Sequence, residues 1–142
     1  GRKLAMADRV IQACGGSVAG KTIAVLGLTF KPETDDMRDA PSLDIVPRLA
    51  AAGAVIRAFD PQGMSFARQL LPAAVHYAQN ALDALGGAEA VVLLTEWNEF
   101  RNIAPDKLAA AMKGRIVLDL RNVYDPAAMR EAGFTYHSIG RP

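Results

Sequence analysis

The chain has 142 residues, of which 51% are hydrophobic and 22% are charged, a composition typical of one compact soluble domain. Its net charge is +1, and its Lys and Arg residues are scattered, so we expect no nucleic-acid partner and no binding to an anionic membrane. Its apolar runs are far shorter than the roughly 20 residues of a membrane-spanning helix, which excludes an integral membrane protein. A single Cys excludes an internal disulfide, and no signal-peptide pattern is visible, so we expect a cytoplasmic protein.

After an opening helix over residues 3–14, the predicted elements alternate between strand and helix. Short apolar, β-branched runs such as TIAVLGL predict strands that are buried on both faces of a parallel sheet, and apolar side chains at helical spacing predict helices. In chain order the predicted strands are 22–28, 54–59, 75–78, 90–95, 116–120 and 134–137. The helices predicted after the first one are 42–52, 64–71, 81–85, 105–112 and 126–132.

This alternation predicts an α/β fold: a Rossmann-like, doubly wound, mostly parallel six-stranded sheet with an extra N-terminal helix. Right-handed crossovers give the strand order 3-2-1-4-5-6, which reverses between the first and fourth strands. The opening helix has no strand before it, so we expect it to lie outside the sheet or to belong to a neighbouring piece of protein. We therefore expect the chain to be a fragment.

Pro47 conflicts with the helix that is predicted over residues 42–52. A proline inside a helix removes a backbone donor and costs about 3 kcal/mol. The sequence therefore predicts either a kinked helix or a regular helix that begins near Pro47.

The loops after the first, fourth and fifth predicted strands hold the candidate site, because ligands of open α/β sheets bind beyond the carboxyl ends of the strands, near the reversal. These loops lie in LTFKPETDDMRDAPS, TEWNEF and DLRNVYD. The first lacks the G-x-G-x-x-G pattern that lets the backbone approach a pyrophosphate, so we expect no dinucleotide to bind there in the usual way. Asp60 ends the second strand, where a carboxylate could hold a ribose. The alternative, which we prefer, is a turn-forming Asp before Pro61.

Two cationic side chains follow the first predicted strand. Pro32 restricts Lys31 to extended conformations, which hold its ammonium group near the strand end, where it could meet a phosphate or a hydroxyl. Arg38 has five donors that suit a phosphate or a carboxylate. The alternative is that both only neutralise the acidic residues around them, namely Glu33, Asp35, Asp36 and Asp39.

Arg121 ends the fifth predicted strand and suits a diphosphate, or it pairs with Asp119 or Asp125. Trp97 follows the fourth strand, where we expect it to cover the sheet edge or to pack in an interface, with base stacking as the alternative. No spacing of His, Cys or carboxylates indicates a metal site.

Four segments carry a specific pattern, in a fixed order and at suitable spacing: KTIAVLGLTFKPETDDMRDAPS, AFDP, VVLLTEWNEF and VLDLRNVYD. From about Leu4 onward the chain resembles the C-terminal domain of the UDP-glucose/GDP-mannose dehydrogenase family, which binds the UDP half of the substrate. The resemblance implies an enzyme of three parts, in which an N-terminal NAD-binding domain and a central, dimerising helical region come first. Residues 1–18 are then the end of the connecting helix, and residues 19–142 are the UDP-sugar-binding domain.

The resemblance also implies an activity. The family oxidises the C6 alcohol of a nucleotide sugar to a carboxylate by two hydride transfers to NAD, and we expect UDP-glucose as the substrate and a homodimer as the full-length form. The Cys nucleophile belongs to an upstream G-G-S-C-like motif that Cys14 does not match, so this chain is expected to be inactive alone. The alternatives are a relative that acts on GDP-mannose or a UDP-N-acetylhexosamine, and a non-catalytic nucleotide-binding or oligomerisation module.

The resemblance assigns roles to four residues of this chain. Phe30 and Lys31 match the family's Phe-Lys pair at the substrate, and Arg121 matches an Arg that contacts the substrate. Arg38 matches an Arg that reaches the cofactor across the domain cleft. Leu120 stands where many relatives have Gly, so the backbone there cannot take a positive φ at low cost. No catalytic residue and no metal ligand is expected in this chain.

Overall fold

A six-stranded parallel sheet forms the centre of the protein in the computed structural model, which describes residues 2–29 and 31–138. The strand order is β3-β2-β1-β4-β5-β6, and each pair of neighbours is parallel. This confirms the predicted fold class and the predicted order. The strands are β1 (Thr22–Leu26), β2 (Val55–Phe59), β3 (His76–Tyr77), β4 (Ala90–Leu93), β5 (Ile116–Asp119) and β6 (Thr135–Ser138).

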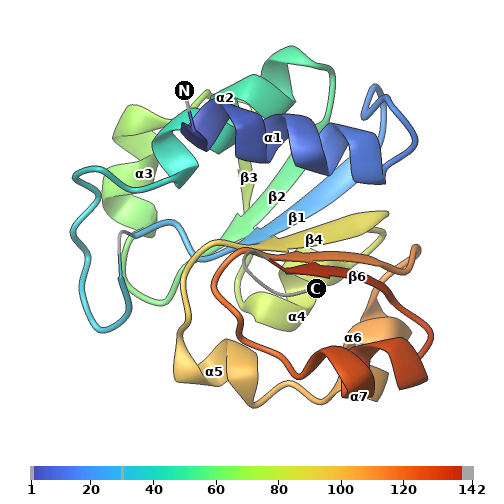
Figure 1. Ribbon diagram of the computed structural model, residues 1–142. Helices are drawn as coiled ribbons and strands as arrows, with labels where there is room; N and C mark the ends of the chain where they lie inside the picture. The colour runs from blue at the N-terminus through green and yellow to red at the C-terminus, as the bar shows by residue number, and fades with distance from the viewer. Residues whose placement is uncertain (1, 30, 139–142) are drawn as a thin grey trace.

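Helices cover both faces of the sheet (Figure 1). One face carries α1 (Arg2–Ala13), α2 (Ser42–Ala51) and α3 (Met64–Leu70). The other carries α4 (Ala81–Leu85), α5 (Asn98–Arg101), α6 (Pro105–Ala111) and α7 (Pro126–Glu131). The sequence did not predict α5, because four residues are too few to show a helical repeat.

Each face of the sheet has its own hydrophobic core, which explains why the buried positions of β1 and β4 are all apolar. Along β1, Ile23 and Val25 belong to the core beneath α1 and α2, whereas Ala24 and Leu26 belong to the core on the other face. All four are fully buried. Successive side chains of a strand point to opposite faces, so a strand that is buried on both faces must be apolar throughout.

Pro47 lies inside α2, which begins at Ser42. The prediction that the regular helix begins near Pro47 is therefore wrong. The helix buries Ile45, Val46 and Leu49 in the first core, and this burial offsets the lost backbone hydrogen bond. Each fully buried aliphatic side chain stabilises a fold by about 1.5–3 kcal/mol, and the three together outweigh the cost of one internal proline.

The opening helix α1 lies outside the sheet, as predicted, and packs beside α2. Its Ala7 and Val10 are fully buried in the core that α2 also lines. Asp8 Oδ1 accepts a hydrogen bond from Arg48 Nη2 of α2 at 3.1 Å. The assignment of α1 to the end of a longer connecting helix stays a prediction.

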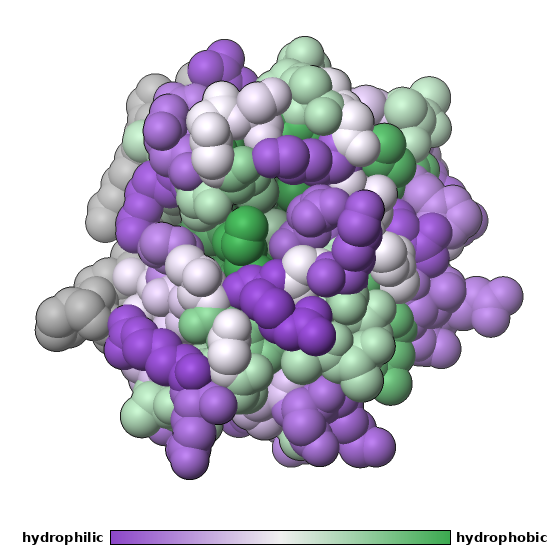
Figure 2. All heavy atoms as spheres, turned by 90° about the vertical axis from the view of Figure 1, so that its right-hand side faces the viewer, coloured by the Kyte–Doolittle hydropathy of each residue, from purple (hydrophilic) through white to green (hydrophobic). Residues whose placement is uncertain are grey.

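The strands all end along one side of the sheet, called the carboxyl edge below, and all begin along the opposite side, the amino edge. The carboxyl ends of the strands lie at the left of Figure 1, beside the long loop that follows β1. The side at the amino ends faces the viewer in Figure 2, where hydrophilic residues are spread among smaller hydrophobic groups. Within the part of the chain that the structure describes, no helix is both long and apolar enough to cross a membrane.

Candidate ligand-binding edge of the sheet

The carboxyl ends of three central strands lie level with one another. Leu26 of β1 is paired with Leu93 of β4, and Leu93 is paired with Asp119 of β5. The loops that follow these strands therefore leave the sheet together, at the reversal of strand order where ligands of this fold class bind.

The loops after β1 and β4 meet at Gly27. This residue has φ of +95°, and a Cβ atom there would lie 2.6 Å from Cβ of Thr95, so the close approach requires glycine. The hydroxyl of Thr95 donates to the carbonyl oxygen of Thr29 at 2.7 Å, and this hydrogen bond is buried. The segment that carries Lys31 is thereby held against the beginning of the loop after β4.

Asp60 follows β2, is fully buried, and binds the loop after β1. Its Oδ2 accepts from the backbone N–H groups of Leu28 (2.7 Å) and Thr29 (3.1 Å) and from the Thr29 hydroxyl (3.2 Å). Its Oδ1 accepts from the N–H groups of Gln62 (2.9 Å) and Gly63 (2.7 Å). These bonds confirm the turn interpretation of Asp60. In a dinucleotide-binding fold the amides of this loop bind a pyrophosphate. Here the amides of Leu28 and Thr29 bind the Asp60 carboxylate instead.

Asp119 ends β5, is fully buried, and fixes the loop that carries Arg121. Its Oδ1 accepts from the backbone N–H groups of Arg121 (3.3 Å) and Val123 (2.9 Å). Its Oδ2 accepts from the N–H of Tyr124 (2.8 Å) and from the hydroxyl of Tyr136 (2.5 Å). Three of these four donors are backbone N–H groups of the loop, so the Asp119 carboxylate holds the backbone of the loop in place.

The turn after β5 takes its positive φ at Asn122, which has φ of 56°. Asn tolerates the left-handed region better than most residues. Leu120, where the resemblance expects Gly, instead packs against the first core. The missing glycine therefore does not distort the start of this loop.

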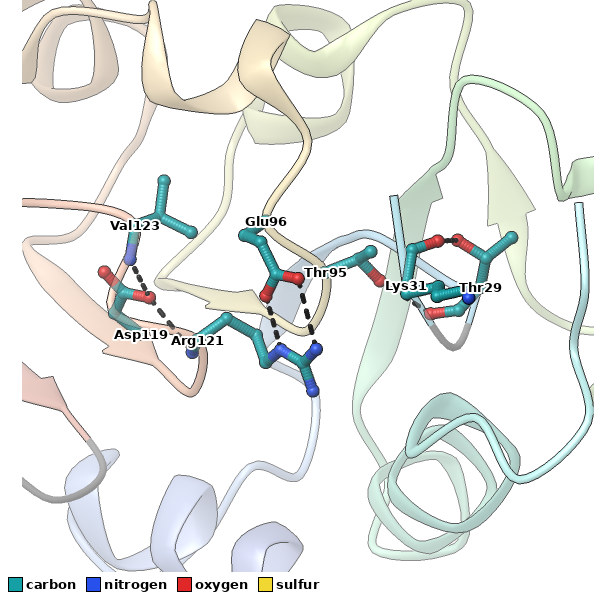
Figure 3. Close-up of polar contacts among 7 residues, drawn as sticks. All are labelled: Thr29, Lys31, Thr95, Glu96, Asp119, Arg121 and Val123. Carbon is teal, nitrogen blue, oxygen red and sulfur yellow. Dashed lines mark hydrogen bonds and ion pairs between the residues drawn. The ribbon is translucent and has the colours of Figure 1, made fainter. Parts of the chain in front are cut away.

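The side chain of Arg121 pairs with Glu96, the third residue of the loop after β4. Arg121 Nε donates to Glu96 Oε2 at 2.6 Å, and Nη2 donates to Oε1 at 3.2 Å (Figure 3). The two side chains are 31% and 28% exposed. The Arg121 hydrogen bond lowers the pKa of Glu96 from its ordinary value, and the same bond raises the pKa of Arg121.

This pair corrects one expectation and reveals a residue that the sequence reasoning missed. Asp119 and Asp125 were the alternative partners of the Arg121 side chain, but the hydrogen bond from Arg121 to Asp119 comes from the Arg121 backbone N–H. Glu96 was not singled out, although it stands in TEWNEF at the carboxyl end of a strand. Parallel pairing of neighbouring strands is the signal that could have placed it beside Arg121.

Lys31 and Arg121 lie at the same edge of the sheet. A chain of contacts connects them: Thr29 donates its hydroxyl to the Lys31 carbonyl at 3.0 Å, Thr95 binds Thr29, and Glu96 follows Thr95 and holds Arg121. Figure 3 shows Thr95 between Glu96 and the segment of Thr29 and Lys31. Lys31 is exposed and forms no ion pair with another described residue.

Phe30 and Arg38 are the other two residues for which a ligand contact was predicted. Phe30 lies outside the described residues. Arg38 pairs with Asp36, through Nε to Oδ1 at 3.1 Å and Nη2 to Oδ2 at 3.0 Å. The Arg38 side chain is 89% exposed, so the pair is a solvated one, and local neutralisation is its arrangement in this structure.

Trp97 and Cys14 are both buried. Trp97 is buried in the second core together with Phe100, which confirms the packing interpretation. Cys14 is buried after α1, and this burial raises the pKa of its thiol, whereas a nucleophilic Cys needs a lowered one. Among the described residues no group of three His, Cys, Asp or Glu could hold a metal ion.

Residues 24–126 match the UDP-binding domain of the UDP-glucose/GDP-mannose dehydrogenase family. The chain belongs to this family. The matched residues run from β1 to the beginning of α7, so they include all three loops at the candidate edge.

The relatives of this family member are longer proteins. The chain is 48% identical over 99% of its length to the UDP-glucose 6-dehydrogenase of Rhizobium meliloti, of which it covers 32%. A solved UDP-glucose dehydrogenase from Pyrobaculum islandicum has a TM-score of 0.76 at 27% identity, with 96% of this chain and 29% of that one covered. A UDP-D-ManNAc dehydrogenase from Pyrococcus horikoshii has a TM-score of 0.75 at 25% identity, with 98% and 30% covered. The chain thus spans about a third of the length of the curated relative.

Proposed function

We propose that the chain is the C-terminal, nucleotide-sugar-binding domain of an NAD-dependent UDP-glucose 6-dehydrogenase, whose full-length form oxidises UDP-glucose to UDP-glucuronate in two hydride transfers. The observation that carries the proposal is the 48% identity over 99% of the chain to the Rhizobium meliloti enzyme. In the longer protein, residues 1–18 are the end of a connecting helix and residues 19–142 are the domain that binds the UDP-sugar.

The proposed substrate contacts are Phe30, Lys31 and Arg121. A nucleotide sugar carries an anionic diphosphate, and the backbone amides of Leu28 and Thr29, at the start of the loop after β1, already donate to Asp60. We therefore expect cationic side chains to supply donors to the diphosphate at this edge. Arg121 offers a planar, directional set of donors, and Lys31 offers a compact charge on a flexible stem.

The proposed cofactor is held mainly by the rest of the polypeptide. NAD, which accepts the hydride, needs loop amides for its pyrophosphate, and in this chain the amides of Leu28 and Thr29 are taken by Asp60. Arg38, on an exposed loop, is the proposed contact of this chain to the cofactor. The catalytic Cys lies outside this chain in the proposal, because the Cys14 thiol is buried and its pKa is raised. The proposed full-length enzyme is a cytoplasmic homodimer, and the chain alone is inactive.

The test is a spectrophotometric assay of the full-length polypeptide and of the 142-residue chain with UDP-glucose and NAD. The full-length protein is expected to form about two NADH per UDP-glucose, since two hydride transfers are needed, and the chain alone none. Calorimetry with UDP and GDP then tests the base. Absence of NADH with UDP-glucose, or tighter binding of GDP than of UDP, would overturn the substrate assignment.

A further inference from the structure

Glu96 holds the Arg121 guanidinium along one edge only. The bonds use Nε and Nη2, and Nη1 points away from Glu96 (Figure 3). A guanidinium has five N–H donors in one plane. The edge that Nη1 forms with the second N–H of Nη2 is therefore left to bind another acceptor.

We infer that Glu96 is a positioning residue, which fixes the Arg121 guanidinium so that its free edge meets the diphosphate of the bound nucleotide sugar. The inference rests on the proposed function, in which Arg121 contacts the substrate. A carboxylate on one edge and a phosphate on the other can bind the same guanidinium together, because each uses a separate pair of N–H groups.

Both partners are held by their backbones before any ligand arrives. Glu96 follows Thr95, whose hydroxyl is bound to the Thr29 carbonyl in a buried contact. The N–H of Arg121 donates to the buried carboxylate of Asp119. A long Arg side chain loses up to about 2 kcal/mol of rotamer entropy when it is ordered, and an Arg that is ordered beforehand does not lose it again on binding.

The alternative is that Glu96 only competes with the diphosphate for the Arg121 guanidinium, and the charge of Glu96 argues against it. A carboxylate beside a diphosphate site repels the ligand, so its presence lowers affinity unless it contributes something else. Arg121 keeps the pKa of this carboxyl below its ordinary value, so the charge persists at neutral pH. What it contributes is direction, since two bonds to a planar group fix the plane of that group as well as its place.

The same strand provides a matched control at its other end. Glu89 precedes β4, as Glu96 follows it, and its Oε1 lies 3.3 Å from Nζ of Lys113. The Glu89 side chain is 32% exposed, close to the 28% of Glu96. Glu89→Gln therefore removes the same charge from a side chain of similar exposure, at the edge of the sheet that lies away from the candidate site.

The experiment measures the dissociation constant of UDP by calorimetry, and the KM and kcat for UDP-glucose, on the full-length protein. Glu96→Gln keeps the shape of the side chain but offers only one acceptor, and we expect it to weaken UDP binding and raise KM about fivefold, with kcat within about twofold. Glu89→Gln should change neither UDP binding nor KM by more than about 1.5-fold. In an Arg121→Lys background, which lacks the fork, Glu96→Gln should have no further effect, as expected of residues that act through one another.

Three results would overturn the inference. These are unchanged or tighter UDP binding by Glu96→Gln, an equal loss with Glu89→Gln, and a loss that persists in full in the Arg121→Lys background. A protein that binds UDP but does not oxidise UDP-glucose would refute the substrate assignment, and the UDP measurements would still decide the role of Glu96. A protein that does not bind UDP would refute both.

Discussion

Strands β4 and β5 are flanked by an acidic and basic pair at each edge of the sheet, and the two pairs differ. At the amino edge, Lys113 approaches Glu89 through one contact of 3.3 Å, and the Lys113 side chain is 72% exposed. At the carboxyl edge, Arg121 binds Glu96 through two hydrogen bonds, and both side chains are about two-thirds buried. The first is an ordinary solvated ion pair, which stabilises a fold by less than about 1 kcal/mol, whereas the second has a fixed geometry.

Buried carboxylates account for the difference. Asp60 and Asp119 each accept several hydrogen bonds from the loops at the carboxyl edge. These bonds fix the loop backbones and also use the amides that would otherwise face an anion. In the proposed function, this edge therefore offers a ligand cationic side chains on loops that these bonds hold in place.

The largest expected effect comes from removing Asp119. The Asp119→Ala variant removes the carboxylate that accepts from the N–H groups of Val123 and Tyr124, and each unmet buried donor costs about 1–3 kcal/mol. The Tyr136 hydroxyl loses one of its two acceptors and keeps the Tyr124 carbonyl. We expect the free energy of unfolding in urea to fall by about 4 kcal/mol. Glu89→Ala, at the amino edge, should lose less than about 1 kcal/mol. Equal losses would show that the two edges do not differ in the way described.

A smaller effect is expected from single hydroxyls. Tyr136→Phe removes one donor to Asp119 and should lower the free energy of unfolding by about 1–2 kcal/mol. Tyr77→Phe is the control, since the buried Tyr77 hydroxyl has no hydrogen-bond partner among the described residues, and we expect it to be neutral or slightly stabilising. A Tyr136→Phe variant as stable as the wild type in the same urea titration would contradict the role given to Asp119.

The smallest expected effect is a pH dependence of the Glu96 pair. Arg121 lowers the pKa of Glu96 in the folded protein, so the pair stabilises the fold above the ordinary Glu pKa of about 4.3 and stops doing so as the pH falls through the lowered value. The wild type should melt slightly above Glu96→Gln at pH 7, and this difference should vanish in strong acid. Glu89→Gln provides the comparison at the amino edge. A difference that grows as the pH falls below 4.3 would have the wrong sign.

The strand order could be predicted because the strands are short apolar runs with helices between them, and the handedness of crossovers leaves few arrangements. The helix α5 could not, because four residues carry no periodicity. Pro47 was misjudged for another reason: its cost is local, while the burial that offsets it comes from residues on the neighbouring elements.

The edge that holds the candidate site was also predictable, since the fold class fixes where ligands bind. The partner of Arg121 was not, because it lies 25 residues away and is brought near only by the register of β4 and β5. The role of Asp119 escaped prediction for a similar reason. From sequence alone, an Asp at the end of a strand is expected at the surface. Only the structure shows that Asp119 is buried and accepts hydrogen bonds from the loop that follows it.

The most direct test of the central claim compares the two arginines that flank β5. Arg115, at the amino edge, donates to the carbonyl oxygens of Met112 and Gly114, whereas Arg121 lies at the carboxyl edge. Calorimetry of UDP binding to the full-length protein should show affinity reduced at least about tenfold, or 1.4 kcal/mol, by Arg121→Ala and unchanged by Arg115→Ala. UDP affinity that survives Arg121→Ala within about twofold would contradict the claim that cationic side chains at this edge bind the diphosphate.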